Sequence, residues 1–110
     1  MAFASGLTPP YYAVIFTSQR KPGDRDYAAT AERMVELART MSGYLGIESA
    51  REEGGFGITV SYWQDEESIR NWKAHLEHQG AQARGKGDWY EHYQTRVARV
   101  ERDYPGPEGR

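Results

Sequence analysis

The chain is predicted to fold as an α+β protein with the β-α-β-β-α-β order of a ferredoxin-like sandwich. Two segments carry apolar residues at helical spacing, and four others are alternating or rich in aromatic and β-branched residues. Its 110 residues fit one domain. We place that domain at residues 11–104. Residues 1–10 and 105–110 are predicted tails, because their prolines and glycines interrupt regular structure.

The first half predicts a strand followed by a helix. Residues 11–17 are aromatic or β-branched for the most part, and a turn is predicted around Pro22 and Gly23. A helix is expected from Asp24 or Asp26 onward, with Gly43 as its left-handed C-terminal cap. Its apolar positions recur every three or four residues: Tyr27, Ala31, Met34, Ala38 and Met41.

The second half predicts a hairpin, a helix and a strand. Residues 45–50 and 56–63 alternate around a glycine-containing turn at 52–55, which is typical of an antiparallel hairpin. A helix begins near Asp65 as its N-cap and buries Ile69, Trp72 and Leu76. A break is expected between Gly80 and Asp88. Residues 89–102 form the last strand, with a helical start as an alternative.

Composition excludes several classes of function. A net charge of −2, with basic residues spread along the chain, argues against nucleic acid and membrane surfaces as partners. Cysteine is absent, which excludes thiolate catalysis and Cys-ligated metals. The first residues lack the pattern of a signal peptide, so a cytoplasmic location is expected. Because strand 11–17 is apolar on both faces, we expect the sheet face without helices to be covered by a second copy, giving a homodimer.

All three tryptophans and all three histidines lie between Trp63 and His92. Trp63 is predicted to line a pocket or to anchor a strand-to-helix corner, and Trp72 shares the apolar stripe of its helix. His75 falls at the edge of that stripe, whereas periodicity turns His78 outward. His92 is expected to be solvated. No metal site is predicted, because no histidines stand at i, i+4 spacing.

Several segments together resemble the antibiotic biosynthesis monooxygenase family. They are Gly43-Tyr44-Leu45-Gly46, Tyr62-Trp63-Gln64-Asp65-Glu66-Glu67, Trp72-Lys73 followed by Glu77-His78, and Trp89-Tyr90 ahead of Arg96-Val97-Ala98-Arg99-Val100. The resemblance covers residues 11–104. It implies a dimeric α+β barrel in which two sheets pack face to face, with a pocket between sheet and helices in each subunit.

The resemblance implies a monooxygenase that needs no cofactor and oxidises a small aromatic phenol, quinol or polyketide-like substrate with O₂. Two alternatives stay open: a non-catalytic ligand-binding or stress-response protein, and a haem-binding or haem-degrading oxygenase with His75 or His78 as axial ligand. The expected catalytic residues are His75, His78, Tyr93 and Arg96. The expected substrate-binding residues are Trp63, Trp72, Tyr62 and Trp89. Trp63, one of the two helix histidines, Tyr93 and Arg96 are all expected to face one pocket.

Overall fold

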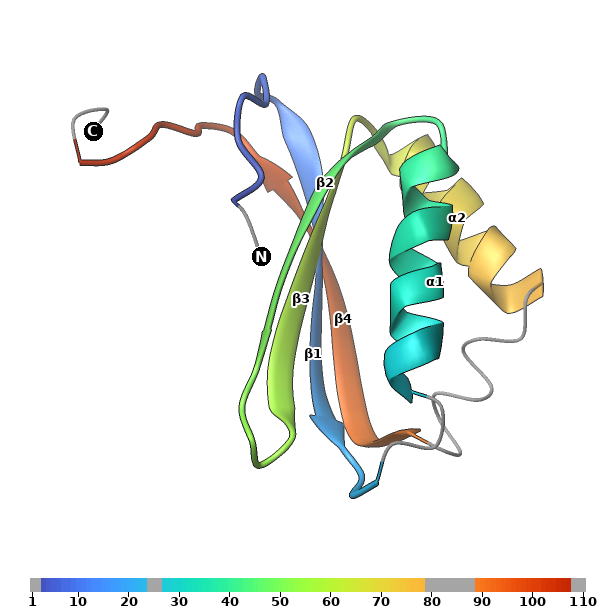
Figure 1. Ribbon diagram of the computed structural model, residues 1–110. Coiled ribbons are helices and arrows are strands. Elements are labelled where there is room, and N and C mark those ends of the chain that lie inside the picture. Colours follow the sequence, from blue (N-terminus) through green and yellow to red (C-terminus); the bar gives the residue numbers. More distant parts are fainter. Residues whose placement is uncertain (1–2, 24–26, 79–88, 108–110) are drawn as a thin grey trace.

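The fold is an antiparallel four-stranded sheet with two helices on one face (Figure 1). The computed structural model describes residues 3–23, 27–78 and 89–107. The elements are β1 (Tyr11–Arg20), α1 (Tyr27–Thr40), β2 (Tyr44–Arg51), β3 (Phe56–Trp63), α2 (Glu66–His78) and β4 (Tyr90–Val100). The predicted order is confirmed, and the fold is ferredoxin-like.

The sheet order β2-β3-β1-β4 places β1 and β3 in the centre and β2 and β4 at the edges. β1 pairs with β3 so that Tyr12 lies opposite Trp63, and with β4 so that Phe16 lies opposite Thr95. Because side chains alternate along a strand, these pairings decide which residues share a face. The register therefore brings residues from distant parts of the chain onto the side that the helices cover.

The predicted N-cap of α2 at Asp65 is confirmed, and Gly43, predicted as the cap of α1, has the expected left-handed conformation three residues after the last residue of that helix. Gly43 follows α1 with a φ of +86°, and its carbonyl accepts a hydrogen bond from the Gln64 amide at 2.8 Å. Asp65 precedes α2, and its carboxylate accepts bonds from the Ser68 amide at 2.8 Å and the Ser68 hydroxyl at 2.7 Å. These bonds hold the pKa of Asp65 below its usual value. The corner at the end of β3 is thus fixed by hydrogen bonds.

The observed boundaries differ from the predicted ones at β1. This strand continues to Arg20 because Ser18 and Gln19 still pair with both neighbouring strands, beyond the predicted end at Thr17. A β-bulge lies at its end, between Gln19 and Arg20. The predicted helix start at Asp24 or Asp26 and the predicted break at 80–88 lie outside the described residues.

The face of the sheet without helices carries two tyrosine–carboxylate pairs near the chain ends. Tyr62 donates to Glu48 at 2.6 Å, and Glu48 also accepts the Ala4 amide at 3.0 Å. Tyr11 donates to Asp103, and its ring contacts that of Tyr62 at 5.7 Å. Burial, followed by this hydrogen bond, raises the pKa of Tyr11 to about 12. Both terminal segments therefore contact this side of the sheet.

A long apolar helix of the kind that crosses a lipid bilayer is not found among the described residues.

Candidate functional site

The candidate site is the sheet face beneath the helices, called the covered face below. Strand alternation assigns to it Tyr12, Val14, Phe16 and Ser18 of β1, Thr59, Ser61 and Trp63 of β3, Ile47, Ser49 and Arg51 of β2, and Tyr93, Thr95 and Val97 of β4. The ring contact between Trp63 and Trp72 of α2 supports this assignment. Tyr90 joins the same face beyond the β-bulge, where it meets Tyr27 of α1. The opposite side is called the open face.

One end of the covered face carries a stack of aromatic rings. Trp63 is fully buried, and its ring lies 5.9 Å from that of Trp72, with 28° between the planes. His75 lies one turn further along α2. Its ring stacks on that of Trp72, with 5.8 Å between the ring centres and 19° between the planes. Tyr44 meets Trp63 edge-on at 5.6 Å, and the Trp63 Nε1–H donates to Ser61 Oγ at 2.9 Å. This end therefore combines apolar walls with one imidazole.

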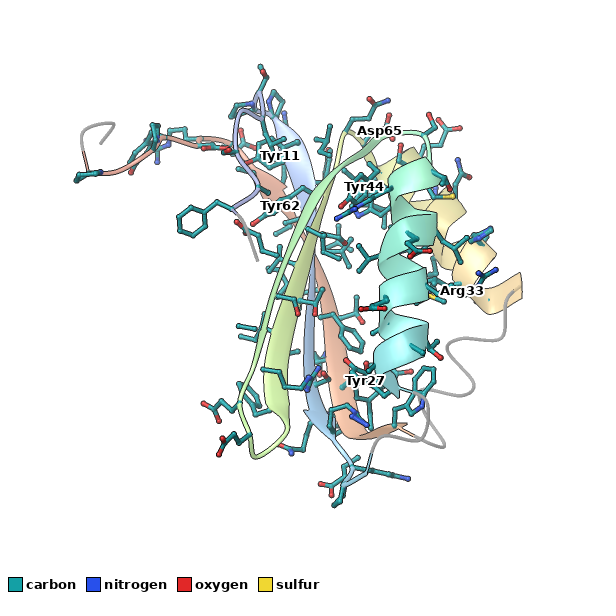
Figure 2. The ribbon with its side chains drawn as sticks, viewed as in Figure 1. Tyr11, Tyr27, Arg33, Tyr44, Tyr62 and Asp65 are labelled. Atoms are coloured by element: carbon teal, nitrogen blue, oxygen red, sulfur yellow. The ribbon has the colours of Figure 1, made fainter. Side chains whose placement is uncertain are left out.

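The other end gathers four more rings around Tyr90. Phe16 lies 5.4 Å from Tyr90 and 5.3 Å from Tyr93. Tyr27, from the first turn of α1, lies 5.9 Å from Tyr90 and 5.8 Å from the buried Trp89. The Tyr90 hydroxyl donates to the Tyr27 hydroxyl at 3.3 Å. Figure 2 shows Tyr44 and Tyr27 at the two ends of the space between the sheet and α1.

Two guanidinium groups lie beside this second cluster. The Arg20 guanidinium carbon is 3.8 Å from the centre of the Tyr27 ring, and that of Arg51 is 5.8 Å from Tyr27 and 5.9 Å from Tyr90. Burial, followed by the hydrogen bond to Tyr27, raises the pKa of Tyr90 well above its usual value, although both cations oppose this shift. Tyr90 is accordingly a neutral hydroxyl donor at neutral pH.

Aliphatic and hydroxyl side chains separate the two aromatic ends. Tyr12 lies opposite Trp63, and Phe16 belongs to the second cluster. These two residues are four positions apart on β1, which corresponds to about 13 Å. Between them the covered face carries Val14, Ile47, Ser49, Thr59, Ser61, Thr95 and Val97. Val97 is 50% exposed although it lies on the covered face. The β4 side of this face is therefore accessible to solvent.

The structure places five of the eight predicted site residues around the covered face. Trp63, Trp72 and His75 form one continuous stack. Tyr93 and Trp89 belong to the second cluster, at the far end. His78 is the last residue of α2, and its side chain lies outside the described part.

The expectation that Arg96 faces the same pocket as Trp63 and Tyr93 is wrong. Arg96 is exposed and pairs with Ile15 on the open face, three residues from Tyr93. Tyr62 also lies on the open face (Figure 2), and its hydroxyl donates to Glu48. The physical reason is strand alternation: Tyr93 and Arg96 are three positions apart on a part of β4 that has no bulge, so they point to opposite sides. That signal is present in the sequence itself.

Other contributors were not predicted from the sequence: Phe16, Tyr27, Tyr44, Arg20 and Arg51. Phe16 was identifiable by its alternation with Val14 and Tyr12. The arginines were not, because their approach to Tyr27 depends on the register of three strands and on the position of α1.

Neither a second pocket nor a metal-binding cluster adds reactive groups to this site in the described part of the chain. A shallow pocket of about 350 Å³ lies between the N-terminal segment, α1 and β2, and Arg39 is its only charged lining residue. No group of three or more histidines and carboxylates suited to a metal ion occurs within 3–23, 27–78 and 89–107.

Comparison with known proteins agrees with this architecture. The family model described as antibiotic biosynthesis monooxygenase matches residues 10–84. The uncharacterised YqjZ protein of Bacillus subtilis is 54% identical over 94 residues, covering 86% of this chain and 82% of YqjZ. Jasmonate monooxygenase ABM of Pyricularia oryzae is 30% identical over 94 residues, which cover 81% of this chain but 43% of that longer protein.

Solved structures share the fold at low sequence identity. SnoaB, a cofactor-independent oxygenase from Streptomyces nogalater, superimposes with a TM-score of 0.69 at 11% identity over 89% of this chain and all of SnoaB. PA3566 from Pseudomonas aeruginosa gives 0.65 at 16% identity over 88% of this chain and 98% of its own. With the family model matching more than half of its length, this chain belongs to the antibiotic biosynthesis monooxygenase family.

Proposed function

We propose that this protein is a monooxygenase that converts a small aromatic phenol or quinol to a quinone with O₂, without a metal or an organic cofactor. The observation that carries the proposal is the covered face, where aromatic rings lie at both ends, one end includes a histidine, and aliphatic and hydroxyl side chains lie between them. Family membership supports the same reaction class. SnoaB and the jasmonate enzyme, both named as oxygenases, add to that support.

The shape of the covered face suits a flat, elongated ligand. The strand positions at its two ends, Tyr12 and Phe16, are about 13 Å apart along β1. Aromatic side chains hold planar ligands by stacking or by edge contacts. A substrate of two to three fused rings would therefore touch both clusters.

His75 is the proposed general base. Its imidazole stacks on Trp72 at 5.8 Å and is partly exposed, so a bound phenol can reach it. Imidazole exchanges a proton near neutral pH, and a phenolate gives up an electron far more readily than the phenol does. His75 would take the phenolic proton at the start of the reaction and return it to the peroxide oxygen later.

The reaction balances with O₂ as the sole co-reactant. The phenolate reduces O₂ by one electron, and the resulting radical pair joins to form a C–O bond at a ring carbon that bears hydrogen. His75 protonates the peroxide. Loss of the ring proton then breaks the O–O bond, leaving a new carbonyl, and the departing hydroxide and that proton form water. The substrate supplies all four electrons that O₂ accepts.

We expect chelator-treated protein to consume O₂ with at least one member of a panel of naphthols, naphthalenediols and anthrones. With ¹⁸O₂, one labelled atom should enter the quinone and one should enter water. His75→Ala is expected to lower kcat by about 100-fold, the usual contribution of a general base. Oxygen uptake and mass spectrometry of the product provide the measurements.

His92→Ala is the matched control, since His92 is exposed on the open face. Equal kcat values for His75→Ala and the wild type would remove His75 from the mechanism. Absence of O₂ uptake across the panel would contradict the proposed function and favour a non-catalytic ligand-binding role. A Soret shift with haemin that His75→Ala abolishes would favour the haem alternative.

We also propose that the protein works as a homodimer joined through its open face. Phe56 and Ile58 lie there at 44% and 41% exposure, next to the half-buried Ile15 and Val60. Contiguous exposed apolar side chains on a sheet are typical of protein interfaces. The second copy would cover these four residues.

Light scattering at micromolar concentration is expected to give twice the chain mass of 12.5 kDa. Ile58→Glu should shift the mass to that of the monomer, because the glutamate would be buried without a partner. Ala29→Glu, at an exposed position of α1, is the control that should stay dimeric. A monomeric mass for the wild-type protein would overturn the dimer proposal.

A further inference from the structure

We propose that Arg51, together with the Tyr27 hydroxyl, binds a carboxylate carried by the aromatic substrate. The site lies at the second aromatic cluster, where β2 ends beside the first turn of α1. This site would make aromatic carboxylates the substrate class of the proposed oxidation. The inference rests on the proposed function, because it takes the bound ligand to be the substrate. The test below measures binding, so it does not require turnover.

The sheet holds the Arg51 guanidinium in place. Its Nη1 donates to the carbonyl oxygens of Gly55 and, at 3.3 Å, Ser18, while Nη2 donates to Ser18 Oγ at 2.7 Å. Ser18 is 2% exposed, so this anchor is buried. A Cβ at Gly57 would lie 2.7 Å from the Arg51 Cζ, so the absence of a side chain there makes room for the cation. The guanidinium is therefore positioned before any ligand arrives.

These anchoring bonds leave donors for a ligand. A guanidinium has more N–H groups than these bonds use, and Nε–H with one Nη2 hydrogen remains. In the part of the chain that the structure describes, no carboxylate forms an ion pair with Arg51. Two adjacent N–H groups match the two oxygens of a carboxylate, which gives a bidentate, charge-assisted contact. A phenol oxygen would fill only half of that arrangement.

Tyr27 supplies a further donor beside this cation. Its hydroxyl accepts the Tyr90 hydrogen at 3.3 Å and keeps its own hydrogen, which is bonded to no other described residue. The Tyr27 ring centre lies 5.8 Å from the Arg51 Cζ. Arg51, Tyr27 and Tyr90 are each partly exposed, so a ligand can reach them. The rings around the cation supply the apolar surface for an aromatic body attached to the carboxylate.

The experiment compares the binding of three ligands of one shape by isothermal titration calorimetry at pH 7. They are 2-naphthoate, which is charged, and 2-naphthamide and 2-naphthol, which are neutral. We expect the wild-type protein to bind 2-naphthoate about tenfold more tightly than 2-naphthamide, the size of effect that one charged hydrogen-bonding group provides. Arg51→Met should abolish that preference while leaving the affinity for the amide unchanged.

Arg33→Met is the matched control, because Arg33 is exposed on α1 and points away from the sheet (Figure 2). Arg51→Lys should keep part of the preference, since lysine keeps the charge but loses the fork. Equal affinity of the wild type for naphthoate and naphthamide, or no binding of either, overturns the proposal. So does a preference that persists in Arg51→Met. If Arg51→Met fails to fold, the wild-type comparison can still overturn the proposal, and Arg51→Lys then tests the contribution of Arg51.

Two outcomes separate the Arg51 site from the proposed reaction. Oxygen uptake without a carboxylate preference would keep the reaction and remove the Arg51 site. A carboxylate preference without oxygen uptake would keep the site and assign it to a protein that binds but does not oxidise.

Discussion

Gly43→Ala is expected to lower the free energy of unfolding by about 3 kcal/mol or more. Two effects add at this position. Gly43 has a φ of +86°, a left-handed conformation that costs a residue with a side chain about 1–2 kcal/mol. An added Cβ would also lie 2.0 Å from Ser68 Oγ and 2.6 Å from Ser68 Cβ, so the start of α2 would have to move.

Two other glycines separate these effects. Gly23 has a φ of +88° but open space around its Cβ position, so Gly23→Ala should show the backbone cost alone, about 1 kcal/mol. Gly54 has neither feature, and Gly54→Ala should leave stability unchanged within error. Urea denaturation of the three variants provides the comparison. Equal losses for Gly43→Ala and Gly23→Ala would show that contact with Ser68 has no energetic weight.

Trp63→Ala is expected to cost about 3–5 kcal/mol, the range for removing a large buried aromatic side chain. Trp63 is the largest fully buried side chain among the described residues. Its loss would remove the ring contacts to Trp72 and Tyr44 and would leave a cavity at the corner between β3 and α2. The buried Nε1–H bond to Ser61 would be lost with it.

Trp72→Ala provides the contrast, because Trp72 is partly exposed and lies between Trp63 and His75. We expect it to cost less than half as much stability, while ligand affinity falls because a wall of the proposed site is removed. Trp63→Phe should keep most of the stability, because a buried aromatic ring remains at the corner. Thermal denaturation and naphthol binding give the two readouts. A larger stability loss for Trp72→Ala than for Trp63→Ala would contradict these roles.

Trp63 and Trp72 were both marked by the sequence, but the structure gives them different degrees of burial. The resemblance and the strand-to-helix pattern both marked Trp63, and its full burial makes it the anchor of that corner, whereas the partly exposed Trp72 stacked on it can contact a ligand. Helical periodicity assigned Trp72 to the core, yet this side chain is only partly buried. One side of its ring stacks on His75. Periodicity identifies the side of a helix that faces the sheet, but it does not say how closely the helix packs against it.

Local patterns in the sequence determined the elements, their order and the capped corner at Gly43 and Asp65. Alternation and turn chemistry act over a few residues, so they can be read without knowing the fold. Alternation also separates Tyr93 from Arg96 when it is applied strictly. Family resemblance then supplied the class of reaction to be tested.

Only the tertiary structure decided which distant residues meet. The grouping of Tyr27 and Arg51 with Phe16 and Tyr90 joins α1 to three strands, and it depends on the pairing of Ser18 with both Gly57 and Tyr93. A shift of one residue in either pairing would move every later side chain to the opposite face. Register is set by the whole sheet together with the helices packed on it, and no local pattern contains it. For that reason the histidine-bearing end of the site was visible in the sequence, whereas its cationic end was not.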